Sequence, residues 1–131
     1  MKALDTGVLL ALLEGSAKAR EQLRKLRGVE LATTEANLLE LSSLAVQGVP
    51  RSRSSRLAAL DKLRRRLTVL PIGPRTLEEL SARPVTLTGR FTPTVAQMLG
   101  TLEAAGCDEL LTDDPRVVVG DWSFKVRVVS V

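Results

Sequence analysis

Segments with the pattern of short buried strands alternate with segments of helical periodicity along most of the chain. The strand candidates that carry this pattern are residues 2–5, 29–32, 68–72 and 109–112. Strands joined through helices form βαβ units, in which the crossover helices cover both faces of a parallel sheet. The sequence therefore predicts an α/β fold of three layers, α/β/α, with a mainly parallel central sheet.

Capping residues and helix breakers delimit the helical segments. Ser16 is a good N-cap for one helix, and Thr33 or Thr34 can cap the next. Thr92-Pro93 is a clear helix start, since proline is favoured at the first helical position, and this helix is expected to run to residue 106. Other helices are expected at residues 6–14, 51–66 and 76–82, an irregular stretch at 83–91, and alternating terminal strands at 117–119 and 124–131.

The size and composition of the chain fit one domain, residues 1–131, without a linker or repeat. Aromatic residues make up only 2%, so the core must be built from Leu, Val and Ala. The apolar runs are too short to cross a bilayer, and Asp5 interrupts the stretch that a signal peptide would continue. A single cysteine, Cys107, suits a reducing compartment. A cytoplasmic protein without membrane partners is therefore expected.

The charge and the absence of histidine narrow the possible chemistry. The net charge of +4 favours polyanionic partners such as nucleic acid. Without histidine, the chain cannot use Ser-His-Asp or Cys-His catalysis and lacks the usual zinc ligands. Any metal ion must be held by oxygen atoms, which indicates Mg²⁺ or Mn²⁺.

Several acids lie at or near the ends of the predicted strands, where parallel sheets bind ligands. Asp5 follows the first strand, and Asp113 and Asp114 follow the fourth. Glu35 begins the helix after the second strand, and Glu40 lies about two turns into it. Clustered acids repel one another and are usually compensated by a cation, which can orient a water nucleophile and neutralise charge on a phosphate. The alternative is that these acids cap helices and form turns.

Three segments, which contain four of these acids, resemble motifs of the PIN-domain family. Asp5-Thr6-Gly7-Val8-Leu9-Leu10-Ala11-Leu12-Leu13 resembles the family's opening strand, which ends in Asp before an apolar helix. Thr33-Thr34 followed by Leu38-Leu39-Glu40-Leu41 resembles the second motif, a helix with an inward Glu. Leu110-Leu111-Thr112-Asp113-Asp114 resembles the late strand that ends in Thr-x-Asp. The motifs follow in the family's order along nearly the whole chain.

This resemblance implies an α/β/α fold, a Mg²⁺ or Mn²⁺ site and cleavage of RNA. Many small members of the family are toxins inhibited by a cognate antitoxin protein, and many form homodimers. By analogy, the catalytic residues and metal ligands would be Asp5, Glu40 and Asp114, with Asp113 as a further ligand. Thr112, and also Thr6, would orient a carboxylate or a water molecule.

The sequence departs from the family in one motif. PIN domains usually carry another Asp at the start of the helix before the late strand, but no acid occurs here between Glu79 and Glu103. Thr94 or Val95 occupies the expected position. The hydroxyl of Thr94 can hold a metal-bound water but supplies no negative charge, so weaker metal binding is expected. The acids that can compensate are Glu35 and Asp113.

A concentration of basic residues in the predicted helix at 51–66 has two interpretations. Its members are Arg51, Arg53, Arg56, Lys62, Arg64, Arg65 and Arg66. They form either a solvated helix face or a surface that contacts RNA phosphates beside the acidic pocket, in which case Arg51, Arg53 and Arg64–Arg66 are the expected contacts.

Three functional hypotheses remain at this point. The chain is a metal-dependent endoribonuclease of the toxin type, a catalytically degenerate PIN-like domain that binds RNA or protein, or an oligomerisation module in which the acids only cap helices.

Overall fold

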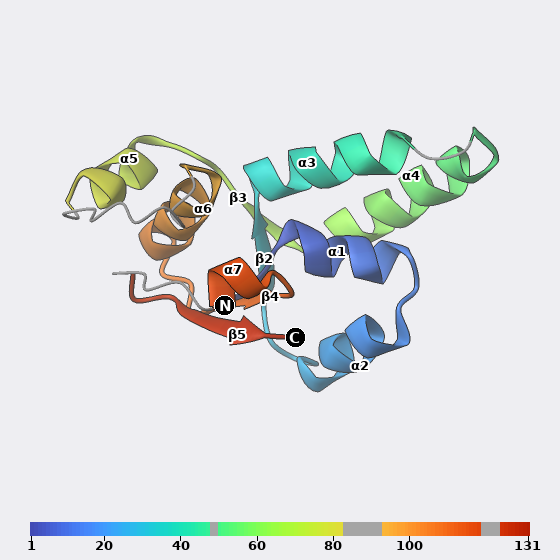
Figure 1. Ribbon diagram of the computed structural model, residues 1–131, viewed down its shortest axis with the longest axis horizontal. Coiled ribbons are helices and arrows are strands. Elements are labelled where there is room, and N and C mark those ends of the chain that lie inside the picture. The colour runs from blue at the N-terminus through green and yellow to red at the C-terminus, as the bar shows by residue number, and fades with distance from the viewer. Residues whose placement is uncertain (48–49, 83–92, 119–123) are drawn as a thin grey trace.

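The computed structural model describes residues 1–47, 50–82, 93–118 and 124–131 (Figure 1). Its strands are β1 (Lys2–Leu4), β2 (Leu31–Thr34), β3 (Thr68–Leu70), β4 (Glu109–Thr112) and β5 (Arg127–Ser130). Its helices are α1 (Thr6–Leu13), α2 (Ala17–Lys25), α3 (Glu35–Val46), α4 (Pro50–Arg64), α5 (Pro74–Ser81), α6 (Pro93–Ala104) and α7 (Pro115–Val118). None of these described helices is long and apolar enough to cross a membrane.

The five strands form one sheet in the order β3-β2-β1-β4-β5, and every neighbouring pair is parallel. The register places Leu4 of β1 opposite Leu111 of β4, so these two strands end side by side. The predicted α/β/α architecture with a parallel sheet is thus confirmed, and the segments that follow β1 and β4 meet at one edge.

Alternate residues of the central strands point to opposite faces of the sheet, and both faces are buried. Ala3 and Leu110 belong to the core on the side of α6, together with Leu99. Leu4 and Leu111 belong to the core on the side of α1, α3 and α4. Figure 1 shows these three helices on one side of the sheet and α5 and α6 on the other. Leucine, valine and alanine supply most of this core, as the composition predicts.

The predicted helix caps at Ser16 and Thr34 are present. The Ser16 hydroxyl accepts a hydrogen bond from the backbone N–H of Ala19 at 3.3 Å, and Thr34 accepts one from the N–H of Asn37 at 3.1 Å. Each cap satisfies a backbone donor that has no partner within the first helical turn.

The predicted terminal strand at residues 117–119 is wrong, because residues Pro115–Val118 form the short helix α7. Asp114 accepts from the backbone N–H of Arg116 at 2.9 Å and proline occupies the first helical position, so local capping outweighs the brief run of valines. The last strand is also shorter than predicted, at Arg127–Ser130. Residue 119, the irregular stretch at 83–91 and the cap at Thr92 lie outside the described residues.

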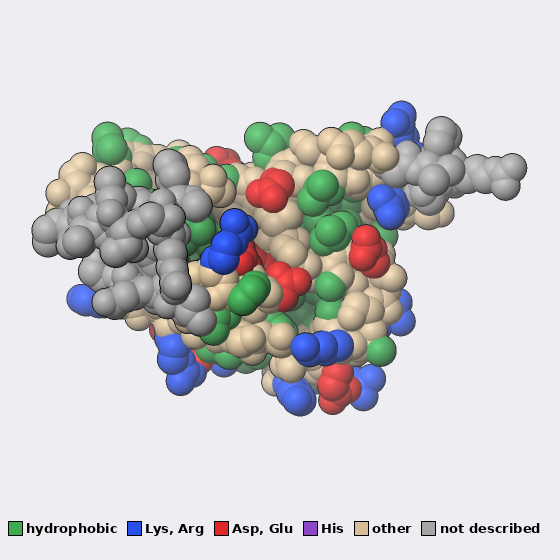
Figure 2. Space-filling model, in the orientation of Figure 1, with side chains coloured by type: hydrophobic (Ala, Val, Ile, Leu, Met, Phe, Trp, Pro, Cys, Tyr) green, Lys and Arg blue, Asp and Glu red, His purple; other side chains and the backbone are tan. Residues whose placement is uncertain are grey.

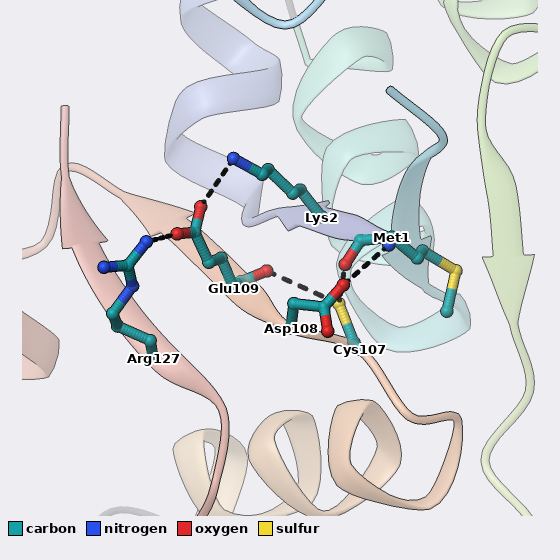
Figure 3. A network of polar contacts seen from close by, with 6 residues as sticks. All are labelled: Met1, Lys2, Cys107, Asp108, Glu109 and Arg127. Carbon is teal, nitrogen blue, oxygen red and sulfur yellow. Dashed lines mark hydrogen bonds and ion pairs between the residues drawn. The ribbon is translucent and has the colours of Figure 1, made fainter. Parts of the chain in front are cut away.

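An ion-pair network joins three neighbouring strands at the edge where they begin (Figure 3). Glu109 of β4 is buried and pairs with Lys2 of β1 at 3.0 Å and with Arg127 of β5, its register partners on either side. Beside them, the Cys107 thiol donates to the Met1 carbonyl at 3.2 Å. Burial raises the pKa of this thiol to about 11, consistent with a packing role. This network lies at the opposite edge of the sheet from the acids discussed next.

Candidate active site

A cleft of about 430 Å³ opens at the carboxyl ends of β1 and β4. Figure 2 shows acidic side chains gathered around a hollow near the middle of this face, with a basic side chain beside them. The residues that line the cleft come from α1, α3, α6, α7 and the strand ends: Asp5, Thr6, Gly7, Asn37, Glu40, Thr94, Val95, Met98, Asp113, Asp114, Arg116 and Val117. The fold thus brings together four of the predicted acids from three distant parts of the sequence.

Asp5 is the most constrained of these acids. It ends β1 and caps α1, so its Oδ1 accepts from the backbone N–H of Val8 at 3.1 Å, while its Oδ2 accepts from the Thr112 hydroxyl. Its side chain is only 7% exposed. Burial raises the pKa of Asp5, and the charges of Asp113 and Asp114 raise it further, although the two hydrogen bonds act in the opposite direction. The fold therefore holds this carboxylate in place at an electrostatic cost.

Thr112 and Thr6 connect the walls of the cleft. Thr112 is buried at the end of β4, where its hydroxyl donates to Asp5 and accepts from the backbone N–H of Asp114 at 3.1 Å. Thr6 donates to the backbone carbonyl of Asn37 in α3 at 3.5 Å. Thr112 therefore contacts the carboxylate that it is predicted to orient, whereas Thr6 links α1 to α3.

Asp113 lies directly against Gly7 in the first turn of α1. A Cβ atom added at Gly7 would lie 2.9 Å from Cγ of Asp113, closer than such atoms approach in proteins, and closer still to Oδ1. The absence of a side chain at Gly7 thus allows Asp113 to approach the helix that Asp5 caps. Asp113 lies in the cleft and adds negative charge near Asp5.

Asp114 is turned toward Arg116. Its Oδ1 accepts from Nε of Arg116 at 3.2 Å and its Oδ2 accepts from Nη2 at 3.1 Å, in addition to the backbone cap described above. The guanidinium holds the pKa of Asp114 below its ordinary value, so this carboxylate is charged and neutralised locally.

The α3 wall carries Glu40, whose side chain is exposed, and Asn37 one turn earlier, which is buried. Asn37 Oδ1 accepts from the Thr34 hydroxyl at 2.7 Å, and Nδ2 donates to the sulfur of Met98 in α6 at 3.4 Å. Sequence reasoning missed Asn37, although its i,i+3 spacing from Glu40 places both on one face of the helix.

The α6 wall lacks the acid that the family usually has there. Thr94 and Val95 line the cleft at this place, and the only acid of α6, Glu103, does not. Of the two acids considered as replacements, Asp113 lines the cleft, whereas Glu35 does not and accepts a hydrogen bond from the backbone N–H of Ile72 at 3.4 Å. Among the described residues, no three acids are grouped closely enough to hold a metal ion by themselves.

The arginines predicted to contact RNA do not line this cleft as far as the structure describes them. At the end of α4, Arg64 and the following residue, Arg65, pair with Asp61 at 2.9 and 3.0 Å. Arg53 of α4 donates to the carbonyl of Val46 at 2.9 Å. Arg66 lines a separate groove of about 300 Å³ between α1, α2 and α4. The side chain of Arg51 lies outside the described residues. Contact of these arginines with RNA therefore remains a prediction.

A parallel sheet with carboxylates at the ends of two adjacent central strands defines an α/β/α protein with an oxygen-rich site. Residues 2–117 match the PIN domain, and the chain belongs to the PIN-domain family. The family predicted from the motifs is thereby confirmed. None of the curated proteins is significantly similar to this chain in sequence.

Solved structures of low sequence identity share the fold. VapBC2 from Rickettsia felis, bound to a DNA fragment from its promoter, aligns with a TM-score of 0.75 and 12% identity over 98% of this chain and 97% of that chain. VapBC-5, of the VapBC family of toxin–antitoxin systems from Mycobacterium tuberculosis, aligns with a TM-score of 0.71 and 21% identity over 99% and 98%. VapC20 from the same organism, a sarcin-ricin loop cleaving toxin, aligns with a TM-score of 0.64 and 17% identity over 97% and 99%. At these identities the likeness shows the fold.

Proposed function

We propose that this chain is an endoribonuclease that depends on a divalent cation, and that it is the toxin of a toxin–antitoxin pair. The observation that carries the proposal is Asp5, a buried carboxylate fixed by two hydrogen bonds and surrounded by further acids. A buried carboxylate beside other negative charges lowers the stability of the fold, and a bound cation would offset this loss.

The residues of the cleft fit Mg²⁺ or Mn²⁺ in their chemistry, since the lining offers carboxylate, amide and hydroxyl oxygens and no histidine or cysteine. Mg²⁺ is commonly held through one or two carboxylates, with water and substrate phosphate completing the coordination. Asp5 would be the central ligand, and Glu40, Asp113 or Asp114 would supply the second. Since no three described acids form a ready-made group, we expect weak cation binding that strengthens when RNA is present.

When bound, the cation would lower the pKa of a water nucleophile and neutralise charge that develops on the phosphate. The chain's own residues hold the carboxylate and the cleft walls in place. Thr112 donates to Oδ2 of Asp5, the α1 cap donates to its Oδ1, and Asn37 links α3 to Met98 of α6 in the wall of the cleft. The arginines of α4 would bind more distant RNA phosphates, and their contribution would weaken with salt.

The partner assignments rest on the structural relatives. VapBC-5 belongs to the VapBC family of toxin–antitoxin systems, and VapC20 is described as a toxin that cleaves the sarcin-ricin loop. By analogy with them we propose a cognate antitoxin and a structured RNA substrate. We also propose a homodimer, as the family resemblance implies, and a cytoplasmic location, as the sequence predicts.

The proposal is tested by RNA cleavage in Mn²⁺, with structured RNA as substrate. We expect cleavage by the wild type, loss of cleavage by Asp5→Asn, and full cleavage by Glu21→Gln, which changes an exposed acid of α2 away from the cleft. Equal cleavage by wild type and Asp5→Asn would refute the site. A cation-binding titration by calorimetry provides a second readout, because saturable Mn²⁺ binding should disappear in Asp5→Asn alone.

A second candidate function is a degenerate PIN domain that binds RNA or protein without cleavage. The observation that favours it is the replacement of the expected acid of α6 by Thr94 and Val95. It predicts RNA binding that needs no metal, together with no saturable Mn²⁺ binding. If the chain binds neither RNA nor Mn²⁺, the third hypothesis remains, in which the chain is an oligomerisation module.

A further inference from the structure

Arg116 is a cation at the rim of an otherwise acidic cleft. Among the described residues that line it, Arg116 is the only Lys or Arg, whereas four are acids. Its guanidinium contacts both oxygens of Asp114 through Nε and Nη2, a two-point geometry that arginine forms and lysine cannot reproduce. The Arg116 guanidinium thus already neutralises the carboxylate of Asp114, which a divalent cation would otherwise neutralise.

We infer that Arg116 competes with the divalent cation for Asp114, and that cation binding releases the guanidinium from Asp114. This inference rests on the proposed function, because it assumes that a cation binds in the cleft. Arg116 then acts as a positioning residue: it weakens cation binding in the absence of RNA and is free to bind phosphate once the cation is in place.

The contacts make this exchange inexpensive. The Arg116 side chain is 79% exposed, so water replaces its bonds to Asp114 readily. The α7 cap does not depend on the guanidinium, because the backbone N–H of Arg116 donates to Asp114 Oδ1 separately. A guanidinium released from Asp114 remains on α7 at the rim of the cleft and retains its preference for phosphate oxygens.

Because an exposed ion pair is weak, its removal should strengthen cation binding only moderately, by about three- to fivefold. Lysine keeps the charge but loses the two-point contact, so Arg116→Lys should have about half of that effect on a logarithmic scale. Arg24→Gln removes an equal charge from α2, outside the cleft, and controls for the change in net charge.

The experiment measures Mn²⁺ binding by calorimetry in the wild type, Arg116→Gln, Arg116→Lys and Arg24→Gln, after thermal melts verify folding. We expect the order of affinity Arg116→Gln, then Arg116→Lys, then wild type, with Arg24→Gln equal to wild type. In parallel, the ¹⁵N-resolved Nε–H signal of Arg116, assigned through Arg116→Lys, should move on saturation with diamagnetic Mg²⁺.

Each outcome has a defined meaning. Equal Mn²⁺ affinity in wild type and Arg116→Gln, or an Nε–H signal insensitive to saturating Mg²⁺, overturns the competition and leaves the proposed nuclease intact. A gain in Arg24→Gln as large as in Arg116→Gln assigns the effect to net charge and also overturns it. Absence of Mn²⁺ binding in every protein overturns both the competition and the proposed function.

Discussion

The contact between Gly7 and Asp113 predicts that Gly7→Ala raises thermal stability but weakens Mn²⁺ binding. Replacement of Gly7 by alanine introduces a Cβ that would lie 2.9 Å from Cγ and 3.0 Å from Oδ2 of Asp113, well inside the 3.4 Å at which ordinary contact begins. The helical backbone is fixed by the Asp5 cap, whereas the Asp113 side chain is exposed. We therefore expect Asp113 to rotate away and the backbone to stay in place.

The expected change in stability is small and favourable. Gly7 lies in α1 without a positive φ, so alanine fits its conformation and improves helix propensity by at most about 1 kcal/mol. Movement of Asp113 also removes negative charge from the neighbourhood of buried Asp5. Together these effects should raise the melting temperature by about 2–4 °C.

The expected change in metal binding is unfavourable. If Asp113 takes the place of the acid missing from α6, moving it should weaken Mn²⁺ binding by about tenfold or more, as loss of ligand positioning commonly does. Calorimetry with Mn²⁺ and a thermal melt provide the two readouts. Asp113→Ala is the matched background, because Gly7→Ala should have no further effect on Mn²⁺ affinity there.

Two results would refute this reasoning. Unchanged Mn²⁺ affinity in Gly7→Ala would mean that Asp113 is not a ligand. Destabilisation by more than about 1 kcal/mol would mean that the backbone of α1 moves and the Asp113 side chain does not.

Three further predictions concern stability and reactivity. Since the pKa of Asp5 is raised in the fold, the contribution of this carboxyl group to stability is fully present below its ordinary pKa of 3.8 and is lost as the pH rises through the folded value. Asp5→Asn should therefore be more stable than the wild type in urea melts at pH 7, with the difference gone near pH 3, and equal stability at pH 7 would contradict the electrostatic cost of Asp5. Glu109→Gln should lower the free energy of unfolding by about 1–2 kcal/mol, because it weakens the ion pairs with Lys2 and Arg127. Its Mn²⁺ affinity should equal that of the wild type, since this network lies apart from the cleft. Iodoacetamide at pH 8 should leave Cys107 unmodified until urea unfolds the chain; rapid labelling of the native protein would contradict its burial.

Much of the fold could be predicted from the sequence because its signals are local. The caps at Ser16 and Thr34 and the apolar character of strands β1 and β4 determine elements within a few residues. The prediction failed at residues 115–118, where two local signals disagree. A run of valines favours a strand, but Asp114-Pro115 starts a helix, and the strength of a capping interaction is not visible in a hydrophobic pattern.

The acids of the site could be predicted for a topological reason. Residues at the carboxyl ends of adjacent parallel strands must converge, so Asp5 and Asp113 are brought together by the sheet itself. Asn37 and Arg116 could not be assigned in the same way. Asn37 contacts Met98 of α6, and Arg116 contacts Asp114. The spacing of residues along a helix predicts which of them share a face, but not which side chains that face contacts.

Asp113 and Glu35 also show that position in the sequence does not determine which acid reaches the cleft. Both are near strand ends in the sequence, and both were candidates to replace it. Glu35 begins α3 and turns to the backbone of Ile72, outside the cleft. Asp113 lies in the cleft against Gly7, where a larger residue would clash with its side chain. A replacement ligand therefore requires a compatible neighbour as well as a carboxylate. On the proposed function, Asp113 and the space that Gly7 leaves for it would together replace the acid that is missing from α6.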